Sequence, residues 1–218
     1  GWHRQHQEGL NYVGVWVENG RIRDIEGGIP FKTGLRKIIE KFRPEVRVTP
    51  HHNLILAGIA DKDVAEVQAL LDAYQLPTDK GISTVRRKEM ACPALPLCPL
   101  AQSESERVMP QIMRQIEEAG LGDADVILRM TGCPNGCARS TVAEIGMIGK
   151  GPGRYTVHIA GAYNGTRLNQ VFRDKVAFED LAPLLIRLIS AWKEHRLPEE
   201  RFGDWSARLG IEKVSALS

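Results

Sequence analysis

The sequence lacks the features that mark membrane proteins and nucleic-acid-binding proteins. No apolar run in its 218 residues approaches the roughly 20 residues of a membrane span. The net charge of +2 is too small to indicate nucleic acid or a membrane surface as a partner. The first nine residues are polar, so they do not resemble a secretory signal. We therefore expect a globular protein with neither nucleic acid nor a membrane as its partner.

The sequence also lacks an initiator methionine. It begins Gly-Trp-His, and a strand pattern starts within about ten residues of that point. We interpret the first residue as a cut inside a larger protein.

Cysteine is scarce, with four residues in the chain. Disulfide frameworks belong to small secreted chains, and this chain is neither small nor visibly secreted. One metal site and unrelated core thiols are the remaining alternatives. A reducing compartment, by default the cytoplasm, follows from this reading.

The first third of the chain predicts a small α+β domain over residues 10–76. An alternating run at 10–17 predicts a strand, and Asn19-Gly20 is typical of a tight turn with a return strand at 21–24. Helices are predicted where apolar residues recur at helical spacing, over 35–42, capped by Thr33, and over 64–74. Two further strands flank a turn at 50–53.

The residue composition changes after residue 77. Residues 77–91 are polar and basic, which fits a solvated linker or a segment that faces an anion. Beyond them the pattern alternates between the two element types. Helices are predicted at 108–119, 137–145 and 181–192, and strands at 126–130, 146–150 and 155–160. We therefore expect a second, mixed α/β domain over residues 78–218.

The four cysteines form two pairs, spaced C-x5-C and C-x3-C and separated by 34 residues. Both pairs lie in loops rich in proline or glycine, where backbone N–H groups can approach sulfur. Four thiolates suit a [4Fe–4S] cluster, which takes one per iron. Zinc also takes four cysteines, but usually with shorter gaps between the two of a pair. Spacing alone favours the cluster and leaves zinc open.

The two cysteine loops carry a family resemblance. Residues 90–101 (MACPALPLCPLA) and 131–139 (TGCPNGCAR) resemble the paired signature of the siroheme nitrite/sulfite reductase family. The similarity extends over nearly the whole chain. It includes residues 53–58 (NLILAG), 149–155 (GKGPGRY), 165–167 (GTR) and 202–205 (FGDW).

The resemblance implies both the fold and the cofactors. Residues 1–77 would be the family's ferredoxin-like half-domain, and 78–218 its siroheme- and [4Fe–4S]-binding domain. Cys92, Cys98, Cys133 and Cys137 would bind one cluster. Cys137 would also bridge to the siroheme iron, which makes it the catalytic residue of this chain.

The resemblance implies an assimilatory sulfite reductase, which reduces sulfite to sulfide with six electrons. Arg139 stands two residues after the last cysteine, as in sulfite reductases, where nitrite-reducing members tend to carry Gln. An ion pair between Arg139 and Glu144 is the structural alternative. A ferredoxin–nitrite reductase and a non-catalytic iron–sulfur electron carrier remain alternative functions.

The family also suggests weaker candidates for cofactor binding. Asn135 lies inside the second cysteine motif. Arg47 and Asn53 flank the turn where the family approaches siroheme, although His51-His52 departs from the usual Asn-Gln. Lys150 and Arg154 flank a Gly-Pro-Gly loop and would face porphyrin carboxylates. An exposed turn and a solvated loop are the structural alternatives.

The resemblance finally implies the partners. Most basic residues that grip sulfite would come from a missing N-terminal half of the same protein, so this chain would be inactive alone. The electron donor would be ferredoxin or a flavoprotein reductase. The compartment would be the cytoplasm, or a plastid for a plant protein.

Overall fold

The computed structural model describes residues 1–218 as two compact units, residues 1–82 and 83–218. The sequence places the boundary after residue 77, within the last segment of the first unit. Leu76 is buried in the core of this unit. The carbonyl of Pro77 accepts a hydrogen bond from the N–H of Trp16 at 2.8 Å. These contacts keep the chain attached to the first unit beyond its last helix.

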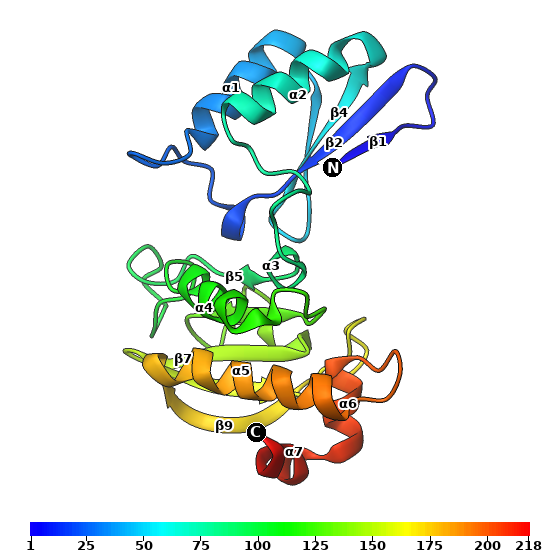
Figure 1. Ribbon diagram of the computed structural model, residues 1–218. Helices are drawn as coiled ribbons and strands as arrows, with labels where there is room; N and C mark the ends of the chain where they lie inside the picture. The colour runs from blue at the N-terminus through cyan, green and yellow to red at the C-terminus, as the bar shows by residue number, and fades with distance from the viewer. The chain divides into compact units, whose positions relative to one another are not determined.

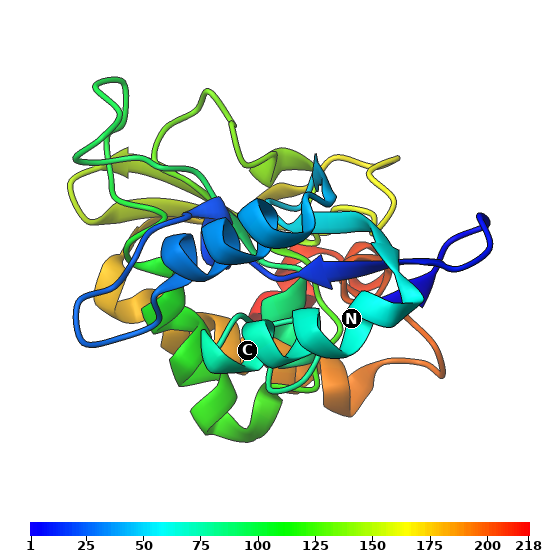
Figure 2. The same ribbon diagram turned by 90° about the horizontal axis from the view of Figure 1, so that it is seen from above.

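The first unit is one antiparallel sheet with two helices that run side by side (Figures 1 and 2). The strand order is β1-β2-β4-β3. Its elements are β1 (Trp2–Arg4), β2 (Leu10–Val15), α1 (Phe31–Phe42), β3 (Glu45–Val48), β4 (Leu54–Ala60) and α2 (Val64–Ala73). This is the α+β arrangement that the sequence predicts.

Apolar side chains at alternate positions of the strands build the core of this unit. Val13 and Val15 on β2 point into it, and so do Leu54 and Leu56 on β4. Residues two apart on a strand share one face, so each strand presents one apolar row to the helices. Helix α1 ends where Arg43 adopts a left-handed conformation (φ 47°), directly before Pro44. Proline disfavours a helical conformation in the residue before it, which is why the helix stops there.

The predicted return strand at 21–24 is wrong. Only Asp24 makes an isolated bridge, to Pro30, and β2 pairs instead with β1 at the start of the chain. The carboxylate of Asp24 accepts hydrogen bonds from the backbone N–H and the hydroxyl of Thr33, at 2.9 and 2.8 Å. Those bonds lower the pKa of Asp24. Thr33 is therefore inside α1, two residues past its start, and does not cap it.

The second unit has a five-stranded mixed sheet in the order β5-β6-β7-β8-β9. Strands β5, β6 and β7 are parallel, and β8 and β9 continue antiparallel. The strands are β5 (Met90–Ala91), β6 (Leu128–Thr131), β7 (Ile145–Gly151), β8 (Arg154–Ile159) and β9 (Gln170–Ala177). The helices are α3 (Thr84–Arg87), α4 (Met109–Ile116), α5 (Phe178–His195), α6 (Phe202–Leu209) and α7 (Ile211–Leu217).

Helices α4 and α5 pack together against one face of this sheet and enclose its core. Leu128 and Met130 of β6 belong to that core. Arg129 and Thr131 alternate with them and therefore point to the opposite face. No helix of the structure has the length and apolar character needed to cross a membrane.

The predicted helix at 137–145 is also wrong. A short 3-10 turn (Ser140–Val142) is the only helical part, and the segment crosses the sheet closely on its way to β7. A Cβ on Gly146 would lie 2.2 Å from the carbonyl oxygen of Ser140, and one on Gly161 would lie 2.0 Å from that of Ala143. Glycine at both positions makes room for this close crossing.

The segment 77–91 is more than a linker. It contains α3 and β5, and the guanidinium of Arg86 contacts the carboxylate of Glu117 at 2.7 Å. The hydrogen bond from Arg86 lowers the pKa of Glu117 despite its partial burial. The alternating elements beyond it agree with the mixed α/β domain that the sequence predicts.

Candidate functional site

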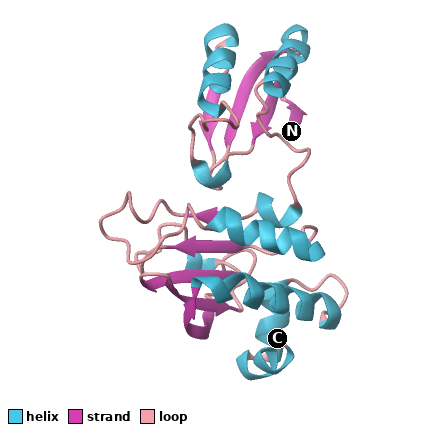
Figure 3. Ribbon diagram, turned by 60° about the vertical axis from the view of Figure 1, so that its left-hand side comes forward, coloured by secondary structure: helices cyan, strands magenta, loops and turns pink.

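The candidate residues gather where three parallel strands end. Cys92 follows β5 directly, and Cys133 lies two residues beyond β6. Lys150 is the second-last residue of β7, and Arg154 begins the antiparallel β8. The carboxyl ends of parallel strands share one edge of a sheet, and α/β proteins commonly bind ligands there. Long loops extend from this edge (Figure 3).

Backbone hydrogen bonds join the two cysteine loops. The N–H of Gly132 donates to the sulfur of Cys92 at 3.3 Å. The carbonyl of Gly132 accepts the N–H groups of Gln102 and Ser103 at 2.8 and 3.0 Å. The residue before Cys133 is thus fixed to both ends of the loop that carries Cys92 and Cys98.

Gly132 is required for this approach. A Cβ there would lie 2.5 Å from the Cβ of Ala94 and 2.6 Å from the carbonyl oxygen of Ser103. Contacts this short do not occur between carbon and other heavy atoms in folded proteins, so any larger residue would push the two cysteine loops apart. The glycine before Cys133 therefore keeps the two motifs in contact.

All four cysteines are free thiols. Cys92 and Cys133 are buried, Cys98 is half-buried and Cys137 is exposed. Burial raises the pKa of the Cys92 thiol, the N–H of Gly132 opposes that rise, and the nearby Cys137 adds to it. One cysteine of each pair therefore lies within electrostatic reach of the other pair.

In this structure no three His, Cys, Asp or Glu side chains are grouped closely enough to hold one metal ion. A zinc ion with Zn–S bonds of about 2.3 Å would draw its four sulfurs to within about 3.8 Å of one another. A four-iron cluster keeps its thiolates farther apart because each binds a different iron. The five-residue gap of the first cysteine pair therefore remains the feature that favours the cluster over zinc.

A tight turn presents Cys137 to solvent. The N–H of Arg139 donates to the carbonyl of Gly136 at 2.7 Å, and both residues have positive φ, 56° and 69°. Ala138, between Cys137 and Arg139, is buried against Met90, Cys92 and Ala94. Anchoring Ala138 leaves the Cys137 side chain on the outside, where it can bind a group that lies against this edge.

Asn169 supports the segment that directly follows the Cys137 turn. The sequence did not indicate this role for Asn169. Its amide donates to the carbonyls of Ser140 and Ala143, at 2.6 and 3.1 Å, and its own N–H donates to Thr141 at 3.0 Å. Asn169 lies 32 residues after Cys137. Nothing in the local pattern connects it to the cysteines.

We expect Asn169→Ala to destabilise the turn behind Cys137. Two carbonyls would lose their donor, which costs about 1–3 kcal/mol when the groups are buried. Denaturant unfolding of the chain would measure this loss, with Asn164→Ala in an exposed loop as the matched control. Equal stability of both variants would remove Asn169 from this supporting role.

Arg139 is exposed, and Glu144, the carboxylate that the sequence suggests as its ion-pair partner, is bonded elsewhere. Glu144 is fully buried and instead accepts hydrogen bonds from Arg201 and from the N–H groups of Ile127 and Gly203. One guanidinium nitrogen of Arg139 lies 3.6 Å from the sulfur of Met90. Asn135 is exposed on the same loop.

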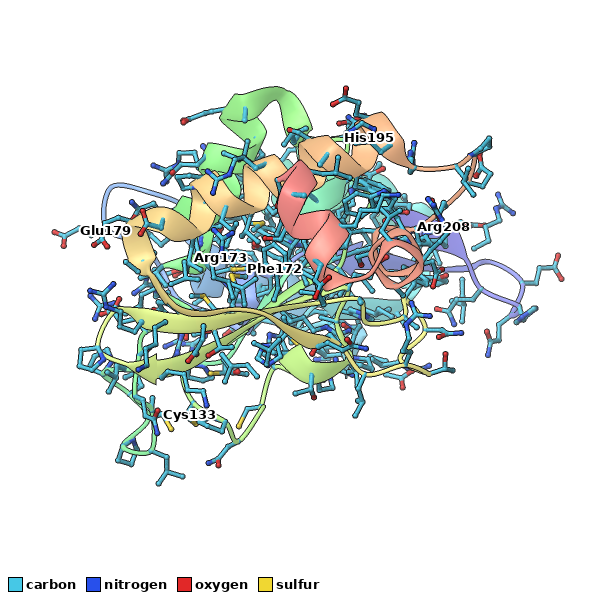
Figure 4. All side chains as sticks on the ribbon, turned by 90° about the horizontal axis from the view of Figure 1, so that it is seen from below. Cys133, Phe172, Arg173, Glu179, His195 and Arg208 are labelled. Atoms are coloured by element: carbon cyan, nitrogen blue, oxygen red, sulfur yellow. The ribbon has the colours of Figure 1, made fainter.

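Lys150 and Arg154 are exposed at the β7–β8 hairpin. The hydroxyl of Ser103 donates to the carbonyl of Arg154 at 3.0 Å and also bonds the carbonyl of Gly151. The hairpin is thereby fixed to the first cysteine loop. Figure 4 shows Cys133 on the other side of the strands from Glu179 and His195, which mark the two ends of α5.

Arg47 and Asn53 belong to the first unit, where each has a local partner. Arg47 forms two hydrogen bonds of 2.9 Å with Glu45 on the same strand, which raise the pKa of Arg47 and lower that of Glu45. The side chain of Asn53 accepts the N–H of Val17 at 2.9 Å. Both residues therefore have a structural role in the first unit.

Comparisons with known proteins agree with these features. Residues 3–74 match the family model "Nitrite/Sulfite reductase ferredoxin-like half domain". The chain is 43% identical over 214 residues to the "Sulfite reductase [NADPH] hemoprotein beta-component" of Methylobacterium sp. (strain 4-46), covering 96% of this chain and 35% of that protein. The protein of the same name from Musicola paradisiaca (strain Ech703) is 40% identical over 204 residues, which cover 92% of this chain and 35% of the relative.

Solved structures share the fold. NirA of Mycobacterium tuberculosis superimposes with a TM-score of 0.75 at 28% identity, over 98% of this chain and 41% of NirA. Dissimilatory sulfite reductase I (DsrI) gives a TM-score of 0.71 at 12% identity, over 95% of this chain and 68% of DsrI, and indicates the fold alone. The chain spans about a third of the length of the curated relatives it matches.

Proposed function

The chain belongs to the nitrite and sulfite reductase family, and we propose that it is the cofactor-binding part of an assimilatory sulfite reductase. One observation carries the proposal. The N–H of Gly132, next to Cys133, bonds the sulfur of Cys92 and so joins two cysteine loops at the carboxyl edge of a parallel sheet.

The residues at this edge fit a [4Fe–4S] cluster. Four reduced thiols on two joined loops supply one ligand per iron. We assign Cys92, Cys98, Cys133 and Cys137 to this role. Free cysteines in such an arrangement also fit a reducing compartment such as the cytoplasm.

The exposed position of Cys137 fits a second role as the thiolate that joins the cluster to siroheme. Siroheme and the cluster, when bound, would pass electrons from the donor to sulfite and supply the iron at which sulfite is reduced. The protein around them must hold anionic groups and deliver protons. Arg139, Lys150 and Arg154 are exposed cations at this edge and fit the binding of anionic cofactor groups, with Asn135 as a neutral donor.

We assign sulfite rather than nitrite as the substrate. Arg139 is an exposed cation two residues after Cys137, at the position where sulfite reductases carry arginine. The curated relatives are named as NADPH-dependent, so a flavoprotein that draws on NADPH is the proposed electron donor, with ferredoxin as the other possibility. An upstream half of the same protein would supply further basic residues for the substrate.

Arg47 and Asn53 are also proposed as siroheme-binding residues. For Arg47 this requires the guanidinium to remain bonded to Glu45 through two of its three nitrogens while the third donates to an anion. For Asn53 the amide nitrogen remains to donate, because its oxygen already accepts from Val17.

Spectra and turnover of the full-length protein would test the function. We expect a heme Soret band above the broad cluster absorption, and oxidation of a reduced donor that depends on sulfite and is faster than with nitrite. A cluster spectrum without the Soret band would indicate an iron–sulfur electron carrier. Faster turnover with nitrite would indicate a nitrite reductase. Either result would contradict the proposal.

A further inference from the structure

Arg129 is a buried cation with almost no hydrogen-bond partner. Only 6% of its surface is exposed. One terminal guanidinium nitrogen donates to the carbonyl of Arg139 at 3.5 Å, at the limit of a hydrogen bond. Its buried Nε has no partner. A buried arginine normally has its guanidinium fully bonded or paired with a carboxylate, so Arg129 is an exception.

Arg129 lies beneath the turn that carries Cys137. Arg129 shares a face of β6 with Thr131, whose hydroxyl lies 3.3 Å from that of Ser140. This face is opposite to the one packed against α4 and α5. The carbonyl that Arg129 contacts belongs to Arg139, two residues after Cys137, so at most about 7 Å of backbone separates them.

The surroundings of Arg129 destabilise its positive charge when no cofactor is bound. Burial lowers the pKa of Arg129, and the positive charge of Arg139 lowers it further. A negative charge that arrives near this site therefore stabilises the charged guanidinium.

We propose that Arg129 is the buried counter-charge of the four-thiolate cluster and raises its reduction potential. This inference rests on the proposed function. Four thiolates give the cluster a net negative charge, and reduction adds one more. A fixed cation stabilises the more negative, reduced form. Arg129 acts through the Cys137 turn and the local field, so it is a positioning residue.

Coulomb's law sets the size of the effect. The guanidinium lies within about 10 Å of Cys137, given the contact with Arg139 and the reach of two residues. At an effective dielectric constant of about 20, a unit charge at this distance changes the reduction equilibrium about tenfold. A tenfold change corresponds to 59 mV for one electron.

The test is a redox titration of the full-length holoenzyme, with the reduced cluster followed by its electron spin resonance signal. We expect Arg129→Met to lower the reduction equilibrium constant about tenfold, a shift of about 59 mV to lower potential. Arg129→Lys keeps the charge and should stay near the wild type. Arg114→Met removes an exposed cation on α4 and should leave the potential unchanged. If Arg129→Met fails to take up the cofactors, Arg129→Gln makes the same charge change with a polar side chain.

An unchanged potential in Arg129→Met or Arg129→Gln, with the cluster intact, would overturn the inference. An equal shift in Arg129→Lys would also overturn it, because loss of packing rather than charge would then be the cause. Both results leave the proposed function intact. A wild-type protein without cluster or heme would contradict the proposed function instead.

Discussion

Cys137→Ser in the full-length protein should lose siroheme and cluster iron together. This side chain is exposed on a turn fixed by Ala138, and we assign it to both cofactors. Serine oxygen is a harder and poorer ligand for these irons than thiolate. Even changes in groups behind a metal ligand cost about 10–100-fold in affinity, so loss of the ligand should cost at least about tenfold.

Cys92→Ser provides the matched comparison. Cys92 is buried against Gly132 and would serve only the cluster, so this variant should keep more siroheme than Cys137→Ser. Heme and iron content per chain would measure the difference. The heme spin resonance signal of the wild type should show magnetic coupling to the cluster. An uncoupled wild-type signal, or full sulfite turnover by Cys137→Ser, would remove the bridging role and leave the other three cysteines assigned.

Glu144→Ala should cause the largest loss of stability. The carboxylate is fully buried and accepts hydrogen bonds from the N–H of Ile127 at 2.9 Å, the N–H of Gly203 at 3.1 Å and the guanidinium of Arg201 at 2.9 Å. It thereby joins the start of β6, the segment before β7 and the start of α6. Leaving the N–H groups of Ile127 and Gly203 without an acceptor costs about 1–3 kcal/mol each.

The measurement is denaturant unfolding of the chain. An exposed glutamate on α7, changed as Glu212→Ala, is the matched control and should shift stability by no more than about 0.5 kcal/mol. The pairing of Arg201 with Asp125 at 2.6 Å remains in the Glu144 variant, so two orphaned backbone N–H groups would dominate its loss. A Glu144→Ala variant as stable as Glu212→Ala would show that these bonds contribute nothing net.

The local patterns predicted elements wherever one face of an element is buried. The alternation at 10–17 and the helical spacing at 181–192 each gave the right element, because burial of one face imposes its period on the sequence. The prediction failed at 21–24 and at 137–145. Asn19-Gly20 forms a 3-10 turn there rather than a hairpin, and β2 finds its partner at the chain's start. At 137–145 the segment is not helical. Asn169 bonds its backbone, and the missing side chain of Gly146 lets the carbonyl of Ser140 lie close to β7.

The chemistry proposed for the candidate site follows from the sequence. Ligand type and number are properties of side chains, so four cysteines in two proline- and glycine-rich motifs were enough to predict a cluster and to suggest a family. Which cysteine faces outward, that Glu144 belongs to Arg201 rather than Arg139, and that Arg129 lies buried beneath the Cys137 turn were decided only by tertiary structure. Those facts depend on contacts between residues far apart in the chain, and local periodicity carries no information about such contacts.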